Sequence, residues 1–363
     1  MKKLRVGVVG LNRGVSFMKI FGAIEDTEVT AICDVDKRIL DRVGESFDIK
    51  DRYQEYEDML EEGIDIVAIS SPMHYHAPQA ISALKSNIHV LSEVTAAISL
   101  DECYLLLEAA KRSKARYMMA ENYCYIKVNV LIENMIRNGL FGDLYFAEGE
   151  YIHDCKHLHH DSHGKPTWRY YWQVGRNGVT YGTHSLGPIL QWFDERVVTV
   201  SCLGSGVHTD PEHPMEDTVL MLCKTESGAL IKIRLDMLSN RPHNLTYYSL
   251  QGTKACYEAP RGLGDSHKVW LADERKKYEW KPLEEYERSY LPEKWKKPPK
   301  EALETGHWGS DYFVVSDFVD SLINDITPPI DIYKALDFTA PGLVSQDSIR
   351  RGGQPLPVPN FRK

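Results

Sequence analysis

Residues suited to ligand binding or proton transfer follow several short apolar runs in the first third of the sequence. The runs cover 64–69, 88–91 and 115–120, and each has the length of a buried strand. Because ligands of open parallel sheets bind beyond the carboxyl ends of the strands, we expect the residues after these runs to share one site. They are Ser70, Pro72, His74, His76, Glu93, Glu121 and Asn122.

The start of the sequence indicates which ligand that site takes. An apolar run over 4–9 leads into the turn Gly10-Leu11-Asn12-Arg13-Gly14, a helical pattern and a second apolar run that ends in Asp34. Strand, glycine turn, helix, strand and acid form the dinucleotide-binding unit. The turn lets backbone approach a pyrophosphate at a helix N-terminus, and Asp34 can accept hydrogen bonds from a ribose diol. Because that acid also repels a 2′-phosphate, the sequence predicts NAD rather than NADP.

Asn12 occupies the place of the usual second glycine in this turn. We expect it to be tolerated because asparagine adopts left-handed backbone more readily than most residues. An ordinary strand-to-helix turn is the alternative, but it does not account for the position of Asp34 relative to the turn. The predicted NAD-binding residues are Gly10, Asn12, Arg13, Gly14, Asp34, Ser70, Pro72, His76, Glu93 and Asn122.

Strand and helix patterns alternate through residues 1–122. This alternation predicts an α/β domain with a doubly wound parallel sheet, the Rossmann fold. The helices expected there cover 15–24, 36–47, 53–60, 76–85 and 100–112.

From residue 123 onward strand-like runs dominate, with helical patterns over 128–137 and 185–193. We therefore expect a second, α+β domain over 123–363, built on a mostly antiparallel open sheet that carries the substrate. Its last part is predicted to hold an exposed loop over 284–304, closing helices over 311–323 and 332–338, and an extended tail from Pro355.

Composition narrows the range of partners. The chain of 363 residues is long enough for two domains, and its net charge of -9 disfavours a nucleic-acid backbone as partner. No apolar stretch is long enough to span a bilayer, and the first strand begins too near Met1 to leave room for a signal peptide. The seven cysteines include no Cys-x-x-Cys pair, which disfavours a disulfide framework or a structural zinc site. We expect a soluble, cytoplasmic protein that binds neither nucleic acid nor membrane.

The whole chain resembles the Gfo/Idh/MocA superfamily of NAD(P)-dependent sugar enzymes, which join a Rossmann domain to a sheet domain that carries the substrate. Members usually have Glu-Lys-Pro after the strand that ends here at Leu91, and the lysine serves proton transfer to a sugar hydroxyl. This chain has Glu93-Val94-Thr95 instead, and the next lysine is Lys111. The usual aspartate four residues before His184 is Thr180. The resemblance therefore implies that a polyol dehydrogenase of the ordinary kind would lack its acid/base pair here.

One branch of that superfamily is more similar, the NAD-dependent α-N-acetylgalactosaminidases of glycoside hydrolase family 109. The similarity spans most of residues 1–260. The segments that carry it are GLNRG at 10–14, EV at 93–94, ENYCY at 121–125, GLFG at 139–142, EYIHD at 150–154, WR at 168–169, RNG at 176–178 and THSLGP at 183–188.

Enzymes of this branch cleave glycosides by a redox route. NAD oxidises the sugar C3 hydroxyl, a base removes the acidified C2 proton, the anomeric substituent is eliminated, water adds, and the hydride returns. The resemblance implies that Tyr151 is the base at C2 and that His184 serves the oxidised hydroxyl. It also implies a substrate-binding set of Glu121, Tyr123, Arg169, Trp172 and His243. His243 is a departure, since the family has tyrosine after Arg-Pro, but histidine can also hydrogen-bond a hydroxyl.

Tyrosine has an ordinary pKa near 10. A tyrosine base therefore requires a nearby positive charge or hydrogen-bond donor, for which Arg169, His153 and the nicotinamide cation are candidates. Without the resemblance, Tyr151 is equally typical of a packing residue on a sheet, and His184 of a helix cap.

The segment 153–163 contains five histidines and two aspartates, which suit zinc or manganese. The spacing of these residues does not place two metal ligands on one face of a helix. A polar loop over a sugar pocket explains the composition of the segment equally well, so we expect no metal. Two other functions stay open: a plain NAD-dependent sugar or inositol dehydrogenase, and a sugar-responsive binding protein without activity. In each case the partner is a small sugar or glycoside, and we expect a homodimer or homotetramer.

Overall fold

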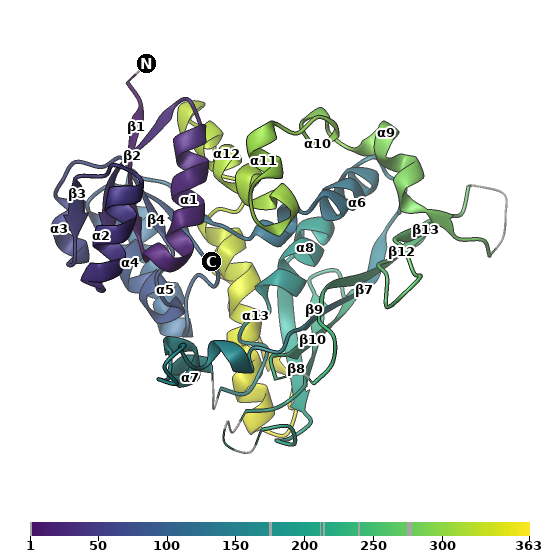
Figure 1. Ribbon diagram of the computed structural model, residues 1–363. Helices are drawn as coiled ribbons and strands as arrows, with labels where there is room; N and C mark the ends of the chain where they lie inside the picture. Colours follow the sequence, from purple (N-terminus) through teal and green to yellow (C-terminus); the bar gives the residue numbers. More distant parts are fainter. Residues whose placement is uncertain (1, 174–175, 211, 213–214, 239, 274–277) are drawn as a thin grey trace. The chain divides into compact units, whose positions relative to one another are not determined.

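The computed structural model describes residues 2–173, 176–210, 212, 215–238, 240–273 and 278–363 (Figure 1). The chain forms two compact units. The first comprises the chain up to Ile126 together with Pro299–Leu336 and Phe361–Lys363, and the second comprises Lys127–Pro298 and Asp337–Asn360. Each unit is described in turn.

The first unit is built on a six-stranded sheet in which every strand pairs in parallel, in the order β3-β2-β1-β4-β5-β6. The strand order reverses between β1 and β4, which is where ligands of doubly wound sheets bind. This topology confirms the predicted Rossmann sheet. The strands are β1 (Leu4–Val9), β2 (Thr27–Cys33), β3 (Asp51–Tyr53), β4 (Ile66–Ile69), β5 (His89–Ser92) and β6 (Tyr117–Met119).

Two helices of the first unit begin at side-chain caps that the sequence supplies. Asp36 accepts a hydrogen bond from the backbone N–H of Arg38 at the start of α2, and Ser99 accepts one from Glu102 at the start of α5. The predicted helix over 53–60 is shorter, because β3 occupies its first residue. The helices are α1 (Leu11–Ala23), α2 (Lys37–Ser46), α3 (Tyr56–Leu60), η1 (Met73–Tyr75), α4 (His76–Lys85), α5 (Leu100–Arg112), η2 (Asn122–Tyr125), α11 (Lys300–Leu303), η5 (His307–Gly309) and α12 (Ser310–Ile323).

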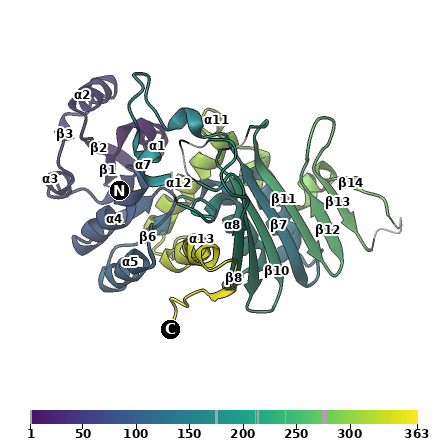
Figure 2. The same cartoon turned by 90° about the horizontal axis from the view of Figure 1, so that it is seen from below.

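The second unit is built on a nine-stranded sheet in the order β14-β13-β12-β11-β7-β10-β9-β8-β15 (Figure 2). Only the β7–β10 pairing is parallel among the described strands, which confirms the mostly antiparallel sheet. The strands are β7 (Leu144–Ile152), β8 (Val197–Gly204), β9 (Val219–Thr225), β10 (Leu230–Asp236), β11 (Asn244–Gly252), β12 (Ala255–Glu258), β13 (Lys268–Leu271), β14 (Lys281–Pro282) and β15 (Leu356–Pro357).

Helix α8 packs against β7 and β11 of this sheet. The approach is close at Gly149 of β7, where an added Cβ would lie 3.1 Å from both Ser185 and Ile189. The described helices of this unit are α6 (Lys127–Arg137), η3 (Lys156–Leu158), α7 (Trp168–Gln173), α8 (Thr183–Phe193), η4 (Leu283–Tyr286), α9 (Glu287–Tyr290) and α10 (Glu293–Lys296), and α13 (Ile332–Arg350) begins in the first unit. In the described part of the chain, none of the helices has the length and apolar character needed to cross a bilayer.

Three expectations for the later part of the chain were wrong. The segment 284–304 is a series of short helices, and not an exposed loop, because Leu291, Trp295 and Ala302 are buried. The helix predicted over 332–338 continues to Arg350. Its Gly342 packs directly against the backbone of Val179, where a Cβ added to the glycine would lie 2.3 Å from the carbonyl oxygen. The segment 299–336 belongs to the first unit, because α12 packs against α1 and η2.

We expect Gly10→Ala to lower the free energy of unfolding by at least about 2 kcal/mol. Left-handed backbone costs a residue with a Cβ about 1–2 kcal/mol, and the φ of Gly10 is 83°. The added methyl group would also lie 2.5 Å from the backbone nitrogen of Ser71. Urea unfolding measures the difference.

The control is Gly22→Ala in the same helix, where an added Cβ meets nothing within 4 Å among the described residues. We expect it to stabilise the protein by about 0.5–1 kcal/mol, because alanine is the better helix former. Equal stability of Gly10→Ala and wild type would contradict the described turn.

Candidate active site

The glycine turn lies at the carboxyl end of β1. Gly10 adopts left-handed backbone and caps α1, while Gly14 lies so close to the sheet that an added Cβ would be 2.7 Å from Val8 and 2.9 Å from the Ser70 hydroxyl. That hydroxyl in turn donates to the carbonyl of Val9 at 2.8 Å. Asn12 lies within α1, so the expectation that it adopts left-handed backbone was wrong: the helix begins one residue after Gly10.

Asp34 ties the end of β2 to the start of α1. One carboxylate oxygen accepts from the backbone N–H of Leu11 at 2.8 Å, and the other accepts from Asp36 at 2.9 Å. A hollow of about 400 Å³ lies beside this turn and is lined by Asn12, Asp36, Arg38, Ile39 and Arg42.

These residues fit NAD. The first turn of α1 lies wholly within the described residues and contains no acidic side chain, so its N-terminal dipole favours an anion such as a pyrophosphate beside the Leu11 N–H that Asp34 accepts from. A Cβ at Gly10 would meet the backbone of Ser70 and Ser71, so glycine allows this turn to lie directly against the segment after β4. Asp34 keeps a half-buried carboxylate at the place expected for the ribose diol.

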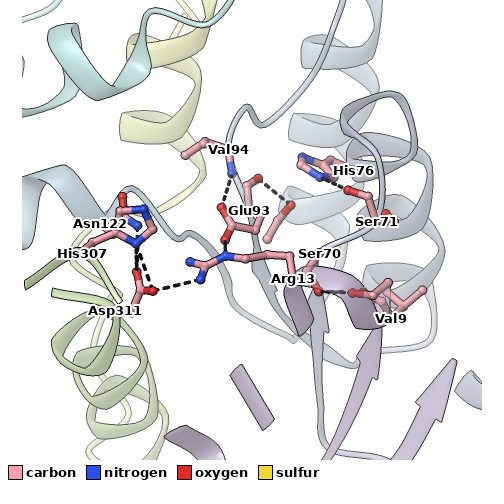
Figure 3. Close-up of polar contacts among 12 residues, drawn as sticks. Val9, Arg13, Ser70, Ser71, His76, Glu93, Val94, Asn122, His307 and Asp311 are labelled. Carbon is pink, nitrogen blue, oxygen red and sulfur yellow. Dashed lines mark hydrogen bonds and ion pairs between the residues drawn. The ribbon is translucent and has the colours of Figure 1, made fainter. Parts of the chain in front are cut away.

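Arg13 connects two carboxylates that are far apart in the sequence (Figure 3). Its Nε donates to Glu93 at 2.5 Å, and a terminal nitrogen donates to Asp311 at 2.9 Å. Asp311 also accepts from Asn122 at 2.7 Å, and His307 Nδ1 lies 3.1 Å from both of its oxygens. Three predicted cofactor residues, Arg13, Glu93 and Asn122, therefore belong to one partly buried network.

Burial alone would raise the pKa of Asp311, but the hydrogen bond from His307 and the charge of Arg13 outweigh it and hold the pKa well below its usual range. Asp311 and His307 were missed in the sequence because nothing local marks them as partners of residues almost 300 positions away. The one available signal was an acidic residue at the start of an apolar helix.

His76 and Pro72 lie at the carboxyl end of β4, as predicted. His76 is buried, with Nδ1 2.9 Å from the carbonyl of Thr95 and Nε2 2.8 Å from the carbonyl of Ser71. Burial lowers its pKa. Its ring thus joins the segments after β4 and β5, and Pro72 begins the short helix η1 between them.

Glu121 and Tyr123 follow β6 and are buried in the first unit. One carboxylate oxygen of Glu121 accepts from the backbone N–H of Tyr123 at 3.2 Å. Five other predicted substrate or catalytic residues belong to the second unit: Tyr151, Arg169, Trp172, His184 and His243.

Tyr151 and His184 lie together in the second unit, supplied by β7 and α8. Their ring centroids are 5.5 Å apart, and both side chains are buried. Tyr181 closes the group, with its ring 5.8 Å from Tyr151 and 5.1 Å from His184. Tyr181 was missed in the sequence, although its position three residues before His184 places both at the start of α8.

His153 extends this group toward His243. Its Nδ1 lies 3.0 Å from the Tyr151 hydroxyl, and its ring meets that of His243 edge to face at 4.5 Å. A cavity of about 460 Å³ is lined by Asp154, Asn240, Arg241, Pro242 and His243.

Arg169 begins α7 and stacks over Trp168, with its guanidinium carbon 4.6 Å from the ring centroid. Its positive charge acts on His153, whose pKa it helps to lower. Trp172 lies in the same helix, and its side chain is outside the described residues.

The chain matches three family models. "Oxidoreductase family, NAD-binding Rossmann fold" covers residues 4–121, "GFO/IDH/MocA C-terminal domain" covers 130–258, and "Glycosyl hydrolase 109, C-terminal domain" covers 208–363. A glycosyl hydrolase family 109 protein of Shewanella putrefaciens is 30% identical, with 100% of this chain and 86% of the relative aligned. The chain belongs to glycosyl hydrolase family 109. An alpha-N-acetylgalactosaminidase of Shewanella oneidensis is also 30% identical over the same shares of both chains.

Solved structures share the fold of this family 109 member at low sequence identity. Levoglucosan dehydrogenase in complex with NADH superposes with a TM-score of 0.82 at 18% identity, covering 99% of this chain and 100% of the other. An oxidoreductase domain protein from Kribbella flavida superposes with a TM-score of 0.84 at 17% identity and the same coverage. The protein is an enzyme with an NAD-binding Rossmann domain, and both the predicted resemblance and the predicted cofactor are confirmed.

We expect this family 109 enzyme to bind NAD more tightly than NADP. Asp34 places a negative charge where the 2′-phosphate would lie. Its carboxylate is held there by the hydrogen bonds that it accepts from the backbone N–H groups of Leu11 and Asp36. Titration calorimetry with both cofactors measures the preference. Equal or reversed affinities would refute the assigned role of Asp34.

We also expect EDTA to leave activity unchanged. Among the described residues, no group of three or more His, Cys, Asp and Glu side chains could hold a metal ion. Asp161, the acid at the centre of the histidine-rich segment, accepts from the backbone of His163 and Lys165 instead. Activity lost in EDTA and restored by one divalent ion would contradict this expectation and assign the segment to a metal site.

Proposed function

We propose that this enzyme is an NAD-dependent glycosidase that cleaves a hexoside by oxidation at C3, deprotonation at C2 and elimination. The observation that carries the proposal is the pairing of Tyr151 with His184 in one buried group, beside a hydrogen-bonded His153. The family match and the Shewanella oneidensis relative, an alpha-N-acetylgalactosaminidase by name, support it.

The position of the usual dehydrogenase lysine supports the same choice. Val94 occupies it here and is buried, so it offers no proton-transfer group. A plain sugar dehydrogenase would need an acceptor for the hydroxyl proton, and His184 can act as that acceptor in either reaction. A dehydrogenase does not need a second base, whereas elimination requires one, and we assign that role to Tyr151.

The roles of the residues follow from this scheme. When bound, NAD supplies the reversible removal of a hydride from sugar C3. His184 accepts the proton of the C3 hydroxyl as the ketone forms, and Tyr151 takes the C2 proton that the ketone has acidified. Elimination of the C1 substituent then leaves an enone, water adds at C1, and Tyr151 returns a proton to C2. General acid–base groups of this kind typically contribute about 10²–10⁴-fold in rate.

The position of His243 beside a cavity supports a role for this residue in substrate specificity. His243 lines that cavity and contacts His153, which in turn contacts Tyr151. A panel of nitrophenyl glycosides that includes the α-N-acetylgalactosaminide identifies the sugar. Accumulation of NADH with a free sugar, without release of nitrophenol from any glycoside, would favour the dehydrogenase function.

We further propose a cytoplasmic homodimer or homotetramer. Leu203, Leu220 and Leu222 are exposed on the adjacent strands β8 and β9, and paired strands with exposed leucines favour an interface. The seven cysteines all lie in the described part of the chain as free thiols, which is consistent with a reducing compartment.

We expect Tyr151→Phe to keep the fold and NAD binding, because only the phenol oxygen is removed. With NAD and a cleaved glycoside, the variant should show one burst of NADH absorbance and then stall, since oxidation at C3 precedes the step that needs Tyr151. His184→Ala should lose the burst itself. Turnover should fall about 10²–10⁴-fold in the tyrosine variant, and normal turnover there would contradict the proposed role.

A further inference from the structure

Tyr151 and His153 are held in a fixed relation by the sheet. They are two residues apart at the end of β7, and the backbone N–H of His153 donates to the carbonyl of Asp236 on β10 at 2.8 Å. The Tyr151 hydroxyl and His153 Nδ1 are 3.0 Å apart, which is hydrogen-bonding distance. Because both backbones are anchored, this contact is a built feature of the site.

The charge state of His153 restricts what the contact can do. Burial lowers the pKa of His153 to about 4, and the nearby His243, His157 and Arg169 add to the effect. The ring is therefore neutral at neutral pH and carries one proton. A ring this weakly basic is a poor destination for a proton from tyrosine, so a relay through His153 is disfavoured.

We propose that His153 is a positioning residue for the tyrosine base: its neutral ring carries its proton on Nδ1 and donates a hydrogen bond to the Tyr151 oxygen. This inference rests on the proposed function and assigns the partner that makes Tyr151 a base. A donated hydrogen bond stabilises the phenolate form. It also turns the hydroxyl hydrogen of the protonated form away from His153, toward the substrate.

The proton balance of the cycle is then simple. The C2–H bond breaks, its electron pair enters the enolate of the C3 ketone, and its proton moves to the Tyr151 oxygen. The enolate then forms the C1–C2 double bond as the C1–O bond breaks, and the departing oxygen takes up one proton and leaves as an alcohol. The water that adds at C1 gives up one proton, which balances the one taken by the alcohol, and the Tyr151 oxygen returns its proton to C2. His153 stays neutral throughout and loses no proton.

Other titratable and charged groups face this pair from every neighbouring segment, and their effects must be separated from that of His153. They are Asp154 after β7, His157 on η3, Arg169 on α7, Tyr181 and His184 at α8, and His243 before β11.

The test is a titration of the Tyr151 phenol in the intact protein without sugar or NAD, by NMR of ring-labelled tyrosine. The chain has 20 tyrosines, so Tyr151→Phe identifies the signal. His153→Gln removes a donor at the Nδ1 position, while His153→Asn places an amide nitrogen there. His163→Asn, in an exposed part of the same segment, is the matched control.

We expect His153→Gln to move the midpoint of the Tyr151 titration upward by about one to two pH units, the equivalent of a lost charge-assisted hydrogen bond. His153→Asn should recover most of that shift, and His163→Asn should cause none. The pH at which C2 hydrogen exchange reaches half of its maximum should move by the same amounts.

An unchanged or lowered midpoint in His153→Gln would overturn the proposal, because it would make His153 a bystander or an acceptor. Equal shifts in the Asn and Gln variants would also overturn it, since packing rather than the donor would then explain them. Because the titration needs no substrate, its result is separate from the proposed function. If the wild-type enzyme exchanges the C2 hydrogen of none of the glycosides, this result contradicts the proposed function but not the role of His153 as a donor to Tyr151.

Discussion

The guanidinium of Arg13 lies between Glu93 and Asp311, and the first unit depends on this arrangement. Arg13 lies in the first turn of α1, Glu93 follows β5, and Asp311 lies on α12 from near the end of the chain. The Asp311 side chain is 1% exposed, so removing Arg13 would take the cationic partner from a buried carboxylate and leave it only the contacts with Asn122 and His307. The network that links α12 to the start of the chain thus also holds the segments after β1 and β5 in place, where NAD is expected to bind.

A second constraint acts at the sheet of the other unit, where the chemistry is proposed to occur. A tyrosine can remove a proton near neutral pH only if its surroundings favour the phenolate. The described neighbours of Tyr151 include the neutral His153, and the positive Arg169 lies near that histidine. In the arrangement that we propose, the neutral His153 as donor and the nearby cation of Arg169 meet this requirement.

Local patterns predicted much of the fold, because strands, helix caps and glycine turns are determined by residues that are close together in the sequence. The strand β1 and the helices α4 and α5 match their predicted bounds. The failures have a common physical origin in contacts between distant segments. Asp311 pairs with Arg13 across 298 positions, and Gly342 fits against the backbone of 179. Asn12 shows the opposite case, since the turn needed left-handed backbone only at Gly10. In the candidate site, the matching segments pointed to Tyr151 and His184, and the sequence already named His153 as a candidate partner of Tyr151. Its contact with His243 depends on the fold and was not predicted.

The central claim is that cleavage passes through C2 deprotonation with the cofactor returned to its starting state. The most direct measurement is mass and NMR analysis of the sugar released from a glycoside in deuterated water with catalytic NAD. The account predicts one carbon-bound deuterium at C2, hydrogen retained at C3, and no net NADH. A released sugar without deuterium at C2 would contradict it, as would NADH formed in proportion to the sugar consumed.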